Sequence, residues 1–118
     1  MSERLEDFQQ FRADLNEEIL GCGHLGIKRF FALDHQAYEP GPLGRKTKEL
    51  LGLVASAVLR CDDCITYHLV RSAEEGSNRE EVIDALHVAL IVGGSITIPH
   101  LRRAFARMRE IDGLKPGA

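Results

Sequence analysis

Apolar residues recur at intervals of three and four along almost the whole chain, and no stretch alternates cleanly with a period of two. The first spacing gathers side chains on one face of a helix, whereas alternation is typical of a strand. The pattern therefore predicts an all-α fold, beginning with a helix that stops near Gly21 and Gly23. The apolar face of this first helix comprises Leu5, Phe8, Phe11, Leu15 and Ile19.

Two more helices are expected before residue 60. A short one covers about residues 27–37 and ends at the turn-rich sequence Glu39-Pro40-Gly41-Pro42. That turn is the only plausible linker, and it is too short to separate two domains. Residues 46–59 are densely apolar, which predicts a helix buried on more than one side.

Acidic residues and a proline mark the starts of two later helices. Asp62 and Asp63 favour a helix start, because acidic groups suit the positive end of the helix dipole. This helix should end at Gly76. Pro99 suits a first helical turn and is expected to open the last helix.

Between these two helices the sequence predicts a fifth, opened by a capping box. Ser77 and Glu80 fit the S-x-x-E pattern, in which the two side chains satisfy each other's backbone amides. Gly93-Gly94 should break this helix. The alternative is a buried strand over residues 88–98, which are rich in β-branched side chains.

Length, charge and hydropathy narrow the class of protein. At 118 residues, with 44% apolar and 28% charged, the chain fits one globular domain over residues 1–118, a bundle of about six helices. A net charge of −3 does not provide the positive electrostatic potential that attracts phosphate groups, so no nucleic-acid partner is expected. Residues 1–14 do not resemble a signal peptide, and residues 85–101 would make a poor membrane span. We expect a cytoplasmic protein with no membrane partner.

A pair of cysteines carries the most specific chemistry in the chain. Cys61-Asp62-Asp63-Cys64 is a C-x-x-C motif, and His68 follows its second cysteine by four residues. On a helix turning about 100° per residue, Cys61, Cys64 and His68 face the same way. Residues three apart in a helical turn have Cα atoms roughly 5 Å apart, which a disulfide accepts. Because cytoplasmic thiols are kept reduced, such a pair favours redox catalysis or metal binding over a structural crosslink.

A reactive thiol also needs a proton acceptor. A free cysteine with a pKa near 8.5 is only about 3% ionised at pH 7, and a helix amino terminus lowers the pKa by less than about one unit. His68, one turn after Cys64, is placed to take its proton. Glu49 lies on the preceding helix, and antiparallel packing of the two helices would bring its carboxylate near the dithiol. It would then accept a proton or orient His68.

Several less specific interpretations compete. A structural zinc site would need a fourth ligand, and no second C-x-x-C or histidine pair follows. A thioredoxin-like motif should follow a strand, but a helix is predicted there. The other four histidines show no metal spacing, so neither a metal nor a cofactor is expected. Cys22 is interpreted as a small apolar filler. The arginines of the last helix are interpreted as a solvated face; they are Arg102, Arg103, Arg107 and Arg109.

The spacing E-x11-C-x2-C-x3-H, from Glu49 through Cys61 and Cys64 to His68, resembles the alkylhydroperoxidase D-like branch of the carboxymuconolactone decarboxylase family. The resemblance extends over roughly residues 43–94. It implies an all-helical fold that assembles into trimers or hexamers. It also implies a peroxidase cycle in which Cys64 attacks the peroxide, Cys61 resolves the sulfenic acid to a disulfide, and a dithiol or lipoyl-bearing protein is the reductant.

Two features depart from the founding enzyme of that branch. Asp63 stands where the founding enzyme has a histidine, and a carboxylate there disfavours a neighbouring thiolate. The chain also holds a single family unit instead of two, so its second half should come from a partner chain.

Three hypotheses follow from the sequence. The first is a thiol-dependent peroxidase or disulfide oxidoreductase that reduces hydroperoxides through Cys61 and Cys64, with His68 and Glu49 as the proton relay. The second is a non-catalytic assembly protein whose disulfide alters subunit packing. The third is a ring-acid decarboxylase or isomerase, which would not need the cysteines.

Overall fold

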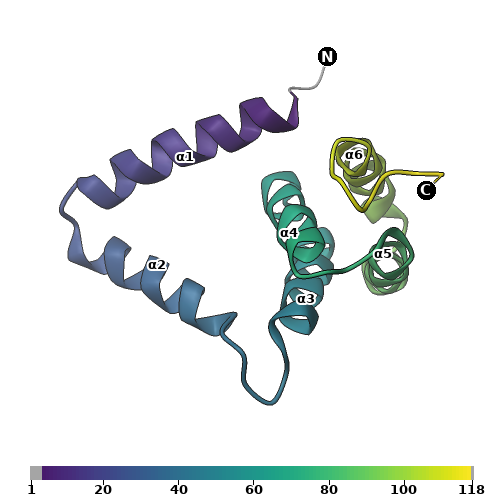
Figure 1. Ribbon diagram of the computed structural model, residues 1–118, viewed down its shortest axis with the longest axis horizontal. Helices are drawn as coiled ribbons and strands as arrows, with labels where there is room; N and C mark the ends of the chain where they lie inside the picture. Colours follow the sequence, from purple (N-terminus) through teal and green to yellow (C-terminus); the bar gives the residue numbers. More distant parts are fainter. Residues whose placement is uncertain (1–3, 118) are drawn as a thin grey trace. The chain divides into compact units, whose positions relative to one another are not determined.

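The computed structural model describes residues 4–117, and this part of the chain contains six α-helices, one 3-10 helix and no strand. The predicted all-α class is confirmed, and the alternative of a strand over residues 88–98 is wrong. The elements are α1 (Leu5–Gly21), α2 (Leu25–Ala37), α3 (Arg45–Val58), α4 (Asp62–Glu74), α5 (Arg79–Gly93), η1 (Ser95–Thr97) and α6 (Ile98–Met108) (Figure 1).

The chain divides into two compact units, one ending at Glu39 and the other beginning at Pro40. The boundary lies in the turn predicted at residues 39–42, and the assignment of residues 1–118 to a single domain stays a prediction. The first unit consists of α1 and α2, and it leaves many large apolar side chains exposed; these include Phe11, Leu25, Phe30 and Leu33. Cys22 is also exposed. The interpretation of Cys22 as a small apolar filler is therefore wrong, because its side chain does not fill the interior of the unit.

The second unit holds the core around which α3 to α6 pack. Helix α3 contacts both α4 and α5, and α4 contacts α6 (Figure 1). Helix α3 therefore packs against two neighbours, as predicted for residues 46–59, but Leu51 and Leu59 of that range are exposed. The fully buried side chains of these four helices include Leu53, Ile65, Leu69, Val82, Leu86 and Met108.

A tight turn between α3 and α4 places the cysteine motif. Arg60 adopts a left-handed conformation with φ of 61°. The amide of Arg60 donates to the carbonyl of Ala57, and the amide of Cys61 donates to that of Ser56, both at 3.1 Å. These two bonds form a Schellman motif, a common helix ending that usually has glycine at the left-handed position. The turn makes Cys61 the N-cap residue of α4.

The start of α5 differs by one residue from the prediction. Asn78, not Ser77, is the N-cap residue, and its side chain accepts the amide of Glu81 at 2.9 Å. The Glu81 carboxylate accepts the amide of Asn78 at 3.0 Å, completing the capping box. Ser77 cannot take this place, because its own amide closes the end of α4 by donating to Ser72 at 2.9 Å.

The predicted glycine break after α5 is present. Gly94 has a φ of 79°, and a side chain on Gly93 would collide with Thr97. The chain then enters η1 and α6, which has a proline in its first turn as predicted.

Candidate active site

The two cysteines of the motif form a disulfide at the start of α4. Their Cα atoms are 5.3 Å apart, in agreement with the spacing predicted for a helical turn. The Sγ of Cys61 accepts a hydrogen bond from the backbone amide of Cys64 at 3.3 Å. Cys64 is exposed and Cys61 is half-buried. Cys64 is therefore the more accessible residue of the pair, and the sulfur of Cys61 has a helix amide directed at it.

A buried carboxylate–imidazole pair lies between α3 and α4. His68 Nδ1 is 2.9 Å from Glu49 Oε1, and the two residues are 7% and 1% exposed. An ionised carboxylate can only accept hydrogen bonds. With Glu49 ionised, the donor of this hydrogen bond is therefore the N–H group at Nδ1 of His68. In a neutral imidazole with the proton on Nδ1, Nε2 is the nitrogen that can accept a proton. The structure thus brings Glu49 to His68, as antiparallel packing of the two helices predicted for its approach to the site.

Arg71 belongs to the same cluster and was missed in the sequence analysis. Its Nε lies 3.6 Å from Glu49 Oε2, so the buried carboxylate has a partner on each oxygen. Arg71 also pairs with Glu74 and Glu75. The hydrogen bond that Arg71 donates to the Glu74 carboxylate raises the pKa of Arg71, against the opposing effect of partial burial. Its position three residues after His68, on the same helix face, was the available signal.

Residues from α6 also approach the cysteine motif. Asp62, between the two cysteines, has His100 Nδ1 at 2.8 Å and Arg103 at 3.5 Å. Arg107 is half-buried and donates from Nε to Thr66 Oγ1 at 3.3 Å. The interpretation of the arginines as a solvated face is therefore wrong for Arg107, and it misses the ion pair of Arg103. Sequence spacing could not show these contacts, because they join residues about forty positions apart.

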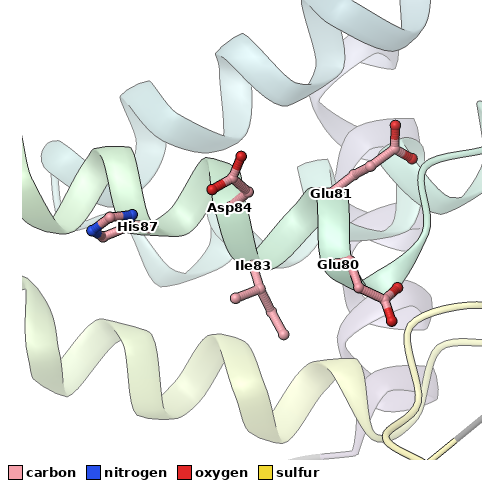
Figure 2. A pocket seen from close by; sticks show the side chains of 5 residues that line it. All are labelled: Glu80, Glu81, Ile83, Asp84 and His87. Atoms are coloured by element: carbon pink, nitrogen blue, oxygen red, sulfur yellow. The ribbon is translucent and has the colours of Figure 1, made fainter.

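A separate feature is an open depression of about 590 Å³ on the surface of α5. Figure 2 shows its acidic and apolar lining, which contains none of the candidate redox residues. The lining residues are Glu80, Glu81, Ile83, Asp84 and His87. Within residues 4–117 no group of three or more His, Cys, Asp or Glu side chains could hold a metal ion. No helix in that range has the length and hydropathy to cross a membrane.

Comparison with known proteins identifies the family. A sequence model of the carboxymuconolactone decarboxylase family matches residues 27–107, and the chain belongs to this family. An uncharacterised protein of the cox locus of Paracoccus denitrificans is 31% identical over 84 residues, which cover 71% of this chain and 76% of that protein. An uncharacterised protein of Cupriavidus necator is 26% identical over 103 residues, covering 85% and 91% of the two chains.

Solved structures agree with this assignment. A carboxymuconolactone decarboxylase family protein of Thermotoga maritima, for which involvement in an antioxidative response has been suggested, is 59% identical. It superposes with a TM-score of 0.84 over 88% of each chain. A family member from Legionella pneumophila has a TM-score of 0.83 at 22% identity, covering 92% of this chain and 97% of its own, and it supports the fold alone.

Proposed function

We propose that the chain is a thiol-dependent peroxidase or disulfide oxidoreductase that reduces hydroperoxides through Cys61 and Cys64, with His68 and Glu49 as its proton relay. One observation carries the proposal. A disulfide at the start of α4 is followed, one helical turn further on, by a buried imidazole whose Nδ1 donates to a buried carboxylate. Such a pair orients the imidazole as a base for a nucleophile.

In the oxidative half-reaction, His68 takes the proton of the Cys64 thiol. The Cys64 thiolate attacks the peroxide, an S–O bond forms, the O–O bond breaks, and the departing alkoxide takes a proton from the imidazolium. Cys61 then attacks the Cys64 sulfenic acid. The S–S bond forms, and the hydroxyl group leaves as water with the proton of the second thiol. Two thiols and one hydroperoxide thus give one disulfide, one alcohol and one water.

In the reductive half-reaction, an external dithiol supplies two electrons. Its thiolate attacks Cys64, because that residue is the more exposed of the two. Cys61 is then the leaving group, and the amide of Cys64 directed at its sulfur would stabilise the departing thiolate. We propose a lipoyl group on a carrier protein as this dithiol, because the exposure of Cys64 leaves that residue open to an external thiol. Asp63 is exposed, so solvent should screen its unfavourable charge.

We also propose that the chain forms a homo-oligomer, a trimer or a hexamer, and works in the cytoplasm, where thiols are recycled. The carboxyl-terminal half of α5 and the following η1 support assembly, because large apolar side chains there are 52% to 72% exposed. These residues are Val88, Ile91, Val92 and Ile96. Exposed apolar clusters of this kind are typical of interaction surfaces.

The test is peroxide consumption with dihydrolipoamide as the dithiol, comparing the wild type with Cys64→Ser. The wild type should consume many equivalents per site, Cys64→Ser should lose turnover, and Cys22→Ser is the matched control that should retain it. Consumption that stops at one equivalent would favour the non-catalytic assembly protein. Activity on a ring acid that survives replacement of both Cys61 and Cys64 by serine would favour the decarboxylase hypothesis.

A further inference from the structure

Helix α6 contacts Asp62, the first of the two residues between the cysteines. The two oxygens of the Asp62 carboxylate have different partners: Oδ1 is 2.8 Å from His100 Nδ1, and Oδ2 is 3.5 Å from Arg103. Both partners come from the first two turns of α6, 38 and 41 residues away along the chain. The side chain of His100 is 18% exposed, so this contact is partly shielded from solvent.

The place of Asp62 gives this contact a chemical consequence. Asp62 lies inside the ring that the disulfide closes, one residue after Cys61. A carboxylate disfavours a nearby thiolate, and a positive group bound to the carboxylate weakens that effect. The oxidised pair carries no charge on sulfur, whereas the reduced pair can carry a thiolate. Charges around Asp62 therefore act more strongly on the reduced form, which changes the reduction potential.

We propose that His100 and Arg103 are positioning residues that raise the reduction potential of the Cys61–Cys64 pair through Asp62. They hold the carboxylate toward α6 and offset its charge, so that the reduced pair is less disfavoured. Reduction by a dithiol transfers two electrons and the accompanying protons, breaking one S–S bond and forming another in the reductant. The inference rests on the proposed function only in requiring that the cysteine pair be reducible.

The reduction potential is expected to shift in opposite directions when the α6 residues and when Asp62 are replaced. His100→Gln and Arg103→Gln should each shift the equilibrium constant toward the disulfide by about threefold. At about 30 mV per tenfold change, this makes the reduction potential of the pair about 14 mV more negative. Asp62→Asn should move it toward the dithiol. In an Asp62→Asn background, Arg103→Gln should not change the reduction potential further. The effects of two substitutions are not additive when one residue acts through the other.

The experiment equilibrates the full-length protein with defined ratios of oxidised and reduced dithiothreitol. Free thiols are then alkylated, and mass spectrometry gives the oxidised fraction of the pair. Arg109→Gln is the matched control: it removes the same charge from an exposed position at the far end of α6. Arg103 is 64% exposed, so its variant should fold even if His100→Gln does not, and circular dichroism checks both.

Each outcome of this titration is decisive. A shift in Arg103→Gln that is absent in Arg109→Gln, and absent when Asp62 is asparagine, supports the inference. Equal values for the two arginine variants, or a shift that persists without Asp62, overturn it. A pair that titrates normally but supports no peroxide turnover overturns the proposed function alone, and a pair that stays oxidised at every ratio overturns both.

Discussion

His68 donates from Nδ1 to Glu49 across the α3–α4 interface at 2.9 Å, and neither residue is more than 7% exposed. A carboxylate removed from water needs partners for both oxygens, and Arg71 supplies the second at 3.6 Å. Removing one partner from such a buried ionic group typically costs about 3–5 kcal/mol. Replacing Glu49 therefore affects the stability of the fold as well as any role in proton transfer. Only variants that keep the shape of the side chain, such as Glu49→Gln, can separate the two effects.

The first prediction concerns the cysteine pair. After treatment with peroxide, the main product should be a Cys61–Cys64 disulfide, because the helical turn already places the two Cα atoms 5.3 Å apart. Cys22 should stay free, although it is exposed. Mass spectrometry of peptides made without reduction measures this, with Cys22→Ser as the control. Recovery of a Cys22 bridge as the main product would contradict the assignment.

The sequence predicted the spacing of the cysteine pair, because Cys61 and Cys64 are related by the helical repeat alone, and their Cα atoms lie 5.3 Å apart. The placement of His68 as the base for Cys64 stays a prediction. Glu49 needed one further assumption, antiparallel packing of two adjacent helices, and the structure brings it to His68.

The contacts from α6 could not be predicted, because they depend on how α6 packs on α4. Nothing in the local pattern around His100 or Arg103 shows that they meet Asp62. The interpretation of Cys22 was wrong for a related reason. Whether that side chain fills the interior depends on packing that the apolar pattern alone does not specify. The predicted N-cap residue of α5 was wrong by one position, because the amide of Ser77 donates a hydrogen bond that ends α4.

The second prediction tests the turn before Cys61. Arg60 stands at a left-handed position, which costs a residue with a side chain about 1–2 kcal/mol. Arg60→Gly should therefore raise the free energy of unfolding by about 1 kcal/mol, after allowing for the greater freedom of glycine in the unfolded chain. Gly76 occupies the equivalent position after α4, with φ of 91°. As the matched reverse change, Gly76→Ala should destabilise the protein in urea unfolding. Equal effects of the two variants would contradict the prediction.

The third prediction is a pH dependence of stability at Glu81. The amide of Asn78 and the ammonium of Lys46 hold the pKa of Glu81 below its ordinary value of 4.5. A lowered pKa in the folded state contributes stability that is present above pH 4.5 and is lost as the pH falls through the folded value. The difference in unfolding free energy between the wild type and Glu81→Gln should therefore shrink in acid.

Urea unfolding of both proteins between neutral pH and pH 3 measures this difference. Glu80→Gln removes the same charge from the same turn of α5 and serves as the control. A wild-type advantage over Glu81→Gln that stays constant down to the lowest pH would show that the capping box and the Lys46 pair do not favour the charged form.

The fourth prediction concerns assembly. Light scattering should report a mass well above the 13.1 kDa of one chain, near that of six. Ile91 is 72% exposed, and Ile91→Glu should dissociate the assembly, because it would place a charge in an apolar contact. Arg102→Glu, at an exposed polar position of α6, is the control and should leave the mass unchanged. A wild-type protein that is monomeric at micromolar concentration would rule out the proposed oligomer.

The last prediction tests the relay. If His68 takes the proton of Cys64, the rate of Cys64 alkylation by iodoacetamide should rise with pH around a lower midpoint in the wild type than in His68→Gln. A shift of about two pH units corresponds to about 2.7 kcal/mol of thiolate stabilisation and cuts the ionised fraction at pH 7 more than tenfold. At about pH 9 most of the rate should return in His68→Gln, because hydroxide then removes the proton.

Glu49→Gln separates two roles for the carboxylate. Its amide oxygen can still accept from His68 Nδ1, so a carboxylate that only orients the ring should give a mild defect. A carboxylate that takes the proton onward should give a defect as large as that of His68→Gln. Arg71→Gln is the matched control, because it perturbs the second oxygen of Glu49 and leaves the imidazole bond in place. Superimposable alkylation curves for the wild type, His68→Gln and Glu49→Gln would mean that neither residue tunes the thiol, and the redox centre would reduce to the cysteine pair alone.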